Sequence, residues 1–312
     1  MDAVIALRQQ WPDWGAKKLH PKLVQLKPEL ARIAVSTVHR ILVRNGLVAN
    51  QDRHRPALGR FERSAPNELW QMDFKGPLGF NKGVGPLSIL DDHSRYLLAL
   101  RHLGNTQAEG VRKTLEQTFA AHGLPETMLV DHGIPWWNSA SAWGWSGLTV
   151  WIMRQGIRMV FSGVRHPQTQ GKVERMHGAL EAAVRKRQGR PAEQTWLDQF
   201  RLEYNTVRPH EALQMQTPET RWKPSPRPYQ PDPPPFLYPS GMETVRLSGQ
   251  GQLNWRGRRW DISRALRNQI VGLQIIGDRV LVFFYSTALR ELHLSSAASL
   301  VLPAQPSGSL DC

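Results

Sequence analysis

Apolar side chains recur at helical spacing in residues 1–50. They fall on two separate faces, one made by Leu19, Leu23 and Leu26 and the other by Val38, Ile41 and Leu42. Ser36 is placed to cap the second helix, and Gly46 is placed to end it. The pattern predicts short helices that finish in a helix-turn-helix arrangement.

The second of these helices keeps polar side chains on its other faces, namely Thr37, His39, Arg40 and Arg44. Such groups suit contacts with phosphates or base edges in a major groove. A helical pair with a basic, merely solvated face gives the same pattern, so both interpretations stay open. Residues 51–66 have little apolar content and are predicted to be a basic linker, in which Arg53 and Arg55 are further candidates for DNA contact.

Residues 67–223 change to strand patterns with helices between them. The predicted strands are 69–74, 85–90, 95–102, 128–130 and 157–161. Thr106 and Glu109 form a capping-box pattern for a helix that Gly123 stops, and a further helix is predicted at 148–154. This order of elements is that of ribonuclease H-like cores and predicts an α/β fold with a mixed sheet.

A longer helix is predicted from about Gly171, followed by another at 196–206. Its apolar stripe consists of Val173, Met176, His177, Leu180 and Val184. Glu174 lies in the first turn of this helix and off the stripe. Residues 224–240 then hold a run with eight prolines between Pro224 and Pro239, which predicts an extended linker and not a packed element.

Short strands separated by turn signals fill residues 241–302 and predict a small β-barrel, with 303–312 as a tail. Within it, Asn254-Trp-Arg-Gly-Arg-Arg-Trp260 alternates basic and aromatic side chains. That alternation suits nucleic-acid contact by Arg256 and Arg258. Tryptophans beside turns are at least as often part of a barrel core, so the two interpretations stand together.

The charge balance narrows the class of partner. Forty Lys plus Arg against 26 Asp plus Glu give a net charge of +14, which favours phosphate backbones or anionic surfaces. The one cysteine, Cys312, excludes internal disulfides and cysteine-based zinc sites. No apolar run approaches the roughly 18 residues of a membrane span and the start lacks a signal-peptide layout, so we expect a cytoplasmic protein without membrane contact.

Three acidic residues stand in settings that indicate chemistry. Asp73 and Asp131 lie at predicted strand ends and Glu174 at a predicted helix start, so the fold could bring them together. Carboxylates are ligands that Mg²⁺ accepts, and two such ions about 4 Å apart can drive phosphodiester transfer. Without metal, mutual repulsion should raise at least one pKa and leave the site loosely ordered. Asp91 and Asp92 lie in a hairpin turn and are assigned to structure.

The motifs around these acids carry a resemblance. They are Leu69-Trp-Gln-Met-Asp-Phe74, Ile89-Leu-Asp-Asp-His-Ser-Arg-Tyr96, Asp131-His-Gly133, Arg165-His-Pro-Gln-Thr-Gln-Gly-Lys-Val-Glu-Arg175, and Tyr204-Asn with Arg208-Pro-His210. In this order the chain resembles bacterial insertion-sequence transposases of the integrase-like DDE class, over nearly its whole length. The resemblance implies a retroviral-integrase-type catalytic core, in which Asp73, Asp131 and Glu174 hold the metal.

The resemblance also implies a mechanism and partners. Two Mg²⁺ ions per site, for which Mn²⁺ is expected to substitute, support two transesterification steps: water frees a 3′-hydroxyl at each element end, and that hydroxyl attacks target DNA. The partners are double-stranded DNA, both terminal inverted repeats and target, with a homodimer or higher assembly on DNA in the bacterial cytoplasm at the nucleoid. Lys172, Arg175 and, more weakly, His177 match positions that hold DNA phosphates.

Some features depart from the family pattern. Most relatives carry Asn where this chain has His132, and relatives often have another helical module ahead of the first one here, from a lineage difference or a missed upstream start. Tryptophans crowd the segment after Asp131, where they pack a flap or stack on bases. Three alternative hypotheses remain. The first is a catalytically silent DNA-binding protein derived from a transposase. The others are a retroviral integrase, which would need a cysteine-containing zinc module, and a ribonuclease H, which would need a fourth acidic metal ligand.

Overall fold

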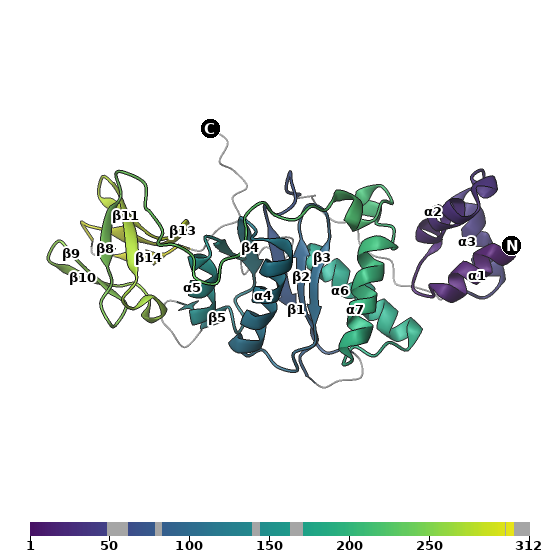
Figure 1. The fold of residues 1–312 in the computed structure, drawn as a ribbon, viewed down its shortest axis with the longest axis horizontal. Coiled ribbons are helices and arrows are strands. Elements are labelled where there is room, and N and C mark those ends of the chain that lie inside the picture. Colours follow the sequence, from purple (N-terminus) through teal and green to yellow (C-terminus); the bar gives the residue numbers. More distant parts are fainter. Residues whose placement is uncertain (49–61, 79–82, 139–143, 163–170, 297, 303–312) are drawn as a thin grey trace.

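The computed structural model describes residues 1–48, 62–78, 83–138, 144–162, 171–296 and 298–302 of the 312-residue chain. Three parts follow one another along the long axis of the molecule (Figure 1). The N-terminal helices lie at one end, a sheet flanked by helices lies in the middle, and the C-terminal strands lie at the other end.

The N-terminal part consists of three helices around a small apolar core. They are α1 (Asp2–Gln10), α2 (Ala16–Leu26) and α3 (Val35–Arg44), with a 3-10 turn at Pro28–Leu30. The predicted apolar faces supply this core, except that Leu26 is exposed. The prediction for Leu26 is wrong because it is the last residue of α2, where the chain leaves the helix for the 3-10 turn.

The two ends of α3 differ from each other in how well the sequence predicts them. Gly46 ends the helix as predicted: its φ is +66°, and the amide of the following Leu47 donates to the Leu42 carbonyl at 2.9 Å. Glycine is favoured in this left-handed position because it has no Cβ to clash. The predicted Ser36 cap is wrong, because α3 begins at Val35 and Ser36 already lies inside its first turn.

The central part is built on a five-stranded mixed sheet in the order β3-β2-β1-β4-β7. The strands are β1 (Trp70–Phe74), β2 (Leu87–Asp91), β3 (Leu97–Arg101), β4 (Thr127–Val130) and β7 (Arg158–Phe161). β1, β2 and β3 pair antiparallel, whereas β4 is parallel to both β1 and β7. The predicted α/β fold with a mixed sheet is confirmed.

Helices cover both faces of this sheet. On one face, α4 (Ala108–His122) and α5 (Gly147–Arg154) pack with Trp70 and Met72 of β1. On the other, α6 (Gly171–Arg187) and α7 (Gln194–Thr206) pack with Leu90 and Leu97. The predicted stripe of α6 is buried along its whole length, and Glu174 beside it is exposed, as predicted.

Local details of the central part depart from the sequence patterns. The capping box at Thr106 is wrong, because α4 begins at Ala108 after Gln107, and its N-cap makes no side-chain hydrogen bond. Gly123 does end this helix, with a φ of +77°. A two-stranded hairpin that the patterns did not predict, β5 (Trp137–Asn138) with β6 (Gly144–Trp145), lies between β4 and α5.

The proline-rich segment contains no helix or strand over 224–239, as predicted, but it does not stand clear of the fold. The Arg227 guanidinium donates to the carbonyls of Pro125 at 2.7 Å, Gly156 at 2.9 Å and Gln155 at 3.3 Å. The Leu124 amide donates in turn to the Arg227 carbonyl at 2.8 Å. The prediction that this segment is unpacked is therefore wrong, because polar anchors fix it to the loops after α4 and α5.

The C-terminal part consists of two antiparallel sheets. One has five strands in the order β14-β13-β12-β11-β8, and the other pairs β10 with β9. The strands are β8 (Glu243–Arg246), β9 (Gln252–Trp255), β10 (Arg258–Asp261), β11 (Ile270–Ile276), β12 (Arg279–Phe284), β13 (Thr287–His293) and β14 (Ser299–Val301). β14 was not anticipated, and closure into one barrel stays a prediction. Within the described ranges, no helix combines the length and apolar content that a membrane crossing requires.

Candidate functional site

Asp73 and Asp131 lie side by side on two neighbouring parallel strands. The register pairs Trp70 with Met128 and Gln71 with Leu129. Continuing it two residues further places Asp131, directly after β4, beside Asp73 near the end of β1. Trp70 and Met72 face the α4 side, so the alternation of a strand turns Asp73 to the opposite face, toward α6. The predicted meeting of two strand ends follows from this register.

Glu174 approaches the same face from the helix. It lies in the first turn of α6, and one turn further along the helix His177 places its Nδ1 3.8 Å from the Asp73 carboxylate. The Nε2 of His177 lies 2.9 Å from the Ser88 hydroxyl on β2. Because α6 packs against β1 and β2, its first turn, which contains Glu174, lies near the strand ends that carry the two aspartates.

The electrostatics at Asp73 are those of a crowded acidic site. Its side chain is 21% exposed. Burial and then the negative charge of Asp131 raise the pKa of Asp73 to about 7, and Glu174 adds a smaller contribution in the same direction. The Phe74 amide and the Lys75 ammonium oppose this rise without cancelling it. At least one carboxyl group thus behaves as the sequence predicts for a cluster without metal.

His177 is a neutral neighbour of this cluster. Burial, and less strongly the positive charge of Lys75, lowers the pKa of His177 to about 3. The imidazole is therefore uncharged near neutral pH and contributes a hydrogen bond to Ser88, not a cation. Its predicted contact with DNA phosphate stays a prediction, and in this structure the ring lies inside the fold.

Asp131 is held by the loop that follows it. The Gly133 amide donates to its Oδ1 at 3.0 Å. His132, in the position where the family resemblance leads one to expect Asn, packs its ring 5.0 Å from Trp137 and 5.2 Å from Phe161 between ring centroids. Of the tryptophans after Asp131, Trp136 and Trp145 are buried in the core. Packing of this segment, the first of the two predicted roles, is confirmed for these residues.

The donor set fits a divalent cation, although it is not a closed cage. Asp73, Asp131 and Glu174 offer carboxylate oxygens, the ligands that Mg²⁺ prefers. Within the described residues, no three His, Cys, Asp or Glu side chains are close enough to form a ready-made metal site. The pKa of Asp73 is raised first by burial and then by the negative charge of Asp131, and a bound cation would favour the ionised carboxylate.

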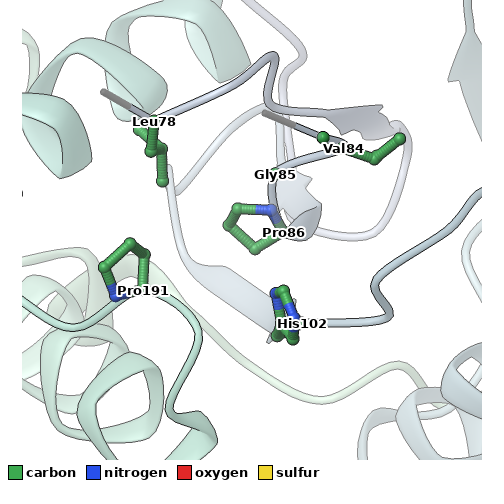
Figure 2. A pocket seen from close by; sticks show the side chains of 7 residues that line it. Leu78, Val84, Gly85, Pro86, His102 and Pro191 are labelled. Atoms are coloured by element: carbon green, nitrogen blue, oxygen red, sulfur yellow. The ribbon is translucent and has the colours of Figure 1, made fainter. Parts of the chain in front are cut away.

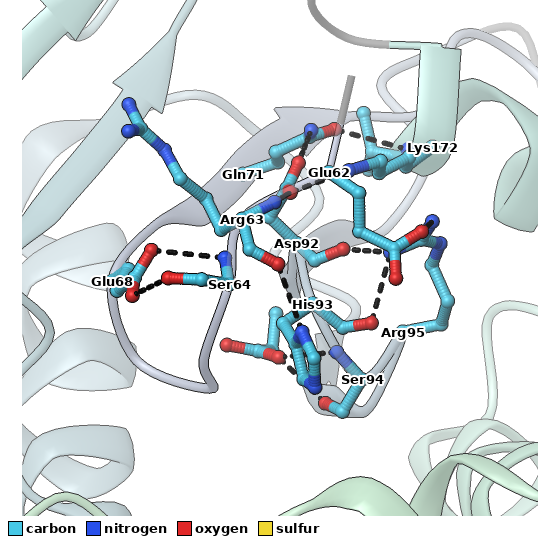
Figure 3. Close-up of polar contacts among 12 residues, drawn as sticks. Glu62, Arg63, Ser64, Glu68, Gln71, Asp92, His93, Ser94, Arg95 and Lys172 are labelled. Atoms are coloured by element: carbon cyan, nitrogen blue, oxygen red, sulfur yellow. Dashed lines mark hydrogen bonds and ion pairs between the residues drawn. The ribbon is translucent and has the colours of Figure 1, made fainter. Parts of the chain in front are cut away.

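Two polar residues near the acids serve functions that the motifs did not reveal. Asp92 is buried, and its carboxylate pairs with the Lys172 ammonium, the group predicted to hold DNA phosphate. Gln71, two residues before Asp73, donates to Asp92 at 2.8 Å (Figure 3). The buried amide of Gln71 in an otherwise apolar strand was the available signal. Asp91 accepts from the Asn67 amide and from Ser94, so its assignment to structure is confirmed.

The other described candidates for DNA contact lie in the N-terminal helices and in the C-terminal strands. His39, Arg40 and Arg44 are exposed on α3, whereas Thr37 is half-buried there. Arg53 and Arg55 fall outside the described residues. Arg256 and Arg258 are exposed at the turn between β9 and β10, beside Trp255 and Trp260, which are buried. All of these contacts stay predictions, while the core role of the two tryptophans is confirmed.

A shallow hollow lies next to the start of β2 (Figure 2). It is lined by Leu78, Gly83, Val84, Gly85, Pro86, His102 and Pro191. None of the three acids borders it. The hollow is small and mainly apolar, and His102 is the polar side chain in its lining.

Two models of known protein families match the central part of the chain. Residues 63–167 match the integrase core domain, and residues 155–218 match a second model with the same description. The chain contains an integrase core domain. This domain holds Asp73, Asp131 and Glu174, together with the sheet and the helices that position them.

Individual relatives are distant. The uncharacterized protein K02A2.6 of Caenorhabditis elegans is 29% identical over 160 residues, and the match covers 49% of this chain but only 11% of that protein. A structure of the simian T-cell lymphotropic virus intasome with a PP2A regulatory subunit is 16% identical, with a TM-score of 0.45 over 91% of this chain and 96% of that chain. The HTLV-2 integrase catalytic core domain with magnesium, in its trimeric form, is 14% identical, with a TM-score of 0.40 over 51% of this chain and 97% of that chain.

Proposed function

We propose that this protein is a DDE-type DNA transposase or integrase, which cleaves the ends of a mobile element and joins the 3′-hydroxyls to target DNA. The observation that carries the proposal is the placement of Asp73 beside Asp131 on one face of the sheet, with Glu174 on the helix that covers that face. The integrase core domain supports it, because that domain spans all three acids.

Asp73, Asp131 and Glu174 would hold divalent cations, Mg²⁺ or Mn²⁺, two per site. When bound, these ions supply an activated nucleophile, a stabilised leaving oxygen and neutralisation of charge on the phosphorus. Other residues of the chain orient and cover two of these acids. The Gly133 amide orients the Asp131 carboxylate, and neutral His177 covers Asp73 on the helix side without competing as a cation.

Exposed Arg175, next to Glu174 in the same turn, is available to hold a DNA phosphate near the acids. Double-stranded DNA, with element ends and target as the two substrates, suits the net charge of +14. Joining two ends requires an assembly of at least two copies on DNA. A bacterial insertion-sequence origin, with action in the cytoplasm on nucleoid DNA, belongs to the same proposal.

The test uses the full chain and DNA duplexes copied from the inverted repeats that flank its reading frame. Asp73→Asn removes one carboxylate charge at nearly constant size, so we expect end cleavage and strand transfer in Mg²⁺ or Mn²⁺ to fall on the order of 10³-fold or more. Rates are measured on denaturing gels and DNA affinity by fluorescence anisotropy. Affinity should change little.

Asp198→Asn is the matched control, because Asp198 is a half-exposed carboxylate on α7 that lies 3.9 Å from Arg101 of β3, two strands from β1. It should cleave like the wild type. Full activity of Asp73→Asn would refute the assignment of this carboxylate. A wild-type protein that binds the repeats and never nicks them with either metal would establish the alternative, a catalytically silent DNA-binding protein.

A further inference from the structure

Asp92 is a fully buried carboxylate at the turn after β2, and its partners come from three separate segments (Figure 3). Its Oδ1 accepts from Gln71 Nε2 at 2.8 Å, and its Oδ2 accepts from the backbone amide of Arg63 at 2.9 Å. Its Oδ2 also pairs with the Lys172 ammonium. A buried charge is tolerated only when such partners satisfy it. Three segments are therefore held together at this one carboxylate.

Gln71 extends the contact from Asp92 to the start of α6. While its Nε2 donates to Asp92, its Oε1 accepts from the backbone amide of Val173 at 3.3 Å. That amide is one of the four at a helix start that have no acceptor within the helix. A single glutamine thus joins β1 to the first turn of α6, and the Asp92 carboxylate fixes the orientation of that glutamine.

The consequence concerns the two acids that these segments carry. Lys172 and Val173 directly precede Glu174 in the same helical turn. Gln71 precedes Asp73 by two residues on β1, so both side chains leave the strand on the same face. The contacts among Asp92, Gln71, Lys172 and Val173 therefore set how the turn bearing Glu174 lies against the strand bearing Asp73.

The neighbouring carboxylate provides a contrast. Asp91 is as fully buried as Asp92 and lies in the same turn. The hydrogen bonds of its carboxylate in the described part of the chain come from Asn67, in the segment before β1, and from Ser94, in the turn. Of the two adjacent aspartates, Asp92 is the one tied to α6.

We propose that Asp92 is a positioning residue that fixes Glu174 relative to Asp73 through Lys172 and Gln71. Asp92 touches no reacting atom in this role. The inference rests on the proposed function for its purpose, since Glu174 needs placing only if it acts with the two aspartates. It also assigns Lys172 a role inside the protein, in place of the DNA phosphate contact that the sequence predicts.

The first measurement does not depend on catalysis. Amide hydrogen exchange of the first turn of α6 is compared among the wild type, Asp92→Asn, Lys172→Met and the control Asp91→Asn. Both Asp92→Asn and Lys172→Met should speed exchange in this turn by at least about tenfold. In these variants the Asp92 contacts are already weakened, so the turn opens at a lower cost in free energy. Asp91→Asn should leave the ratio between exchange in the first turn of α6 and exchange in the sheet the same as in the wild type.

The double variant Asp92→Asn/Lys172→Met separates positioning from stability. It leaves no charge unpaired, so its melting temperature should return close to that of the wild type. Its first α6 turn should still exchange fast, and the Mn²⁺ concentration for half-maximal DNA cleavage should rise about 10- to 100-fold. DNA affinity should match the wild type, and the double variant should be no worse than either single one.

Each other outcome overturns the inference in a recognisable way. Wild-type exchange of the α6 turn in the double variant would show that Asp92 does not hold it. Equal loosening by Asp91→Asn would show a general loss of stability. Weaker DNA binding by Lys172→Met but not by Asp92→Asn would return Lys172 to the DNA. A wild-type protein without cleavage would refute the proposed function, whereas the exchange data would still decide whether Asp92 holds α6.

Discussion

At the scale of single residues, Asp131 depends on the residue two positions after it. The Gly133 amide donates to one carboxylate oxygen, and a Cβ at position 133 would lie 3.0 Å from both of them. That distance is tighter than ordinary van der Waals contact between such atoms. Only a residue without a side chain lets the amide approach the carboxylate in this way.

Gly133→Ala should therefore impair the site while sparing the fold. The carboxylate must turn away from the new methyl group, so we expect the rate of metal-dependent DNA cleavage to fall on the order of 10- to 100-fold. The melting temperature, measured by circular dichroism, should change little. Gly147→Ala is the control, because a Cβ at position 147 meets no atom within 4 Å. Equal cleavage by both variants would show that Asp131 has room to adjust.

The sequence predicted individual site residues where a motif named them, and missed them where only the fold brings them together. Asp73 and Asp131 lie near the ends of β1 and β4 and Glu174 lies in the first turn of α6, as predicted, while their joint role in a metal site stays a prediction. The partnership of Gln71, Asp92 and Lys172 joins three segments that no local pattern relates. Lys172 was predicted to contact DNA because it matches a family position beside Glu174. Its buried partner Asp92 cannot be recognised from the sequence.

At the scale of elements, periodicity was a better guide than caps. The five strands of the main sheet and the helices α4 to α7 were predicted because their apolar residues alternate or recur at helical spacing over several positions. Start points failed at Ser36 and Thr106, because a cap depends on one side chain and helices begin a residue or two away from each. The proline-rich segment was correctly predicted to lack helix and strand, but composition does not reveal anchors such as Arg227.

Arg227→Gln tests that anchoring. The shorter neutral side chain cannot reach the carbonyls of Pro125, Gln155 and Gly156, so we expect the free energy of unfolding to fall by about 2 kcal/mol. The loss is measured by urea denaturation of the full chain. Lys223→Gln in the same segment removes an exposed charge and should stay within about 0.5 kcal/mol of the wild type. If the two variants had the same free energy of unfolding, the hydrogen bonds of Arg227 would contribute nothing measurable to stability.

At the scale of the whole molecule, a buried carboxylate is among the contacts that join the N-terminal helices to the central part. Asp13, between α1 and α2, accepts from Arg187 at the end of α6 at 2.5 Å and from Arg208 after α7 at 2.8 Å. Its side chain is fully buried, and the Arg208 guanidinium also lies 5.8 Å from the centre of the Trp14 ring. No local pattern in the sequence indicates this junction, because each of its charges looks like a surface residue in isolation.

Asp13→Ala should loosen the junction. Arg187 and Arg208 would keep their positive charges in a buried place without the shared carboxylate, at a cost of about 3 kcal/mol. We expect faster hydrogen exchange in α1 and α2 and a larger radius of gyration by small-angle X-ray scattering, while the sheet stays protected. Asp2→Asn, at an exposed position of α1, serves as control. An unchanged radius and exchange pattern would mean that other contacts, such as those of Lys17 and Lys18 with Glu211, hold the N-terminal helices without Asp13.

The pairing of β1 with β4 has a consequence for how this protein can change over generations. The alternation that buries Trp70 and Met72 on one side is the same alternation that presents Gln71 and Asp73 on the other. A slip by one residue would exchange the two sets and bring Met72 or Phe74 to the place of Asp73. Selection for a packed interior thus also keeps the side chain at position 73 on the α6 side of the strand, whereas the identity of that side chain has to be selected separately.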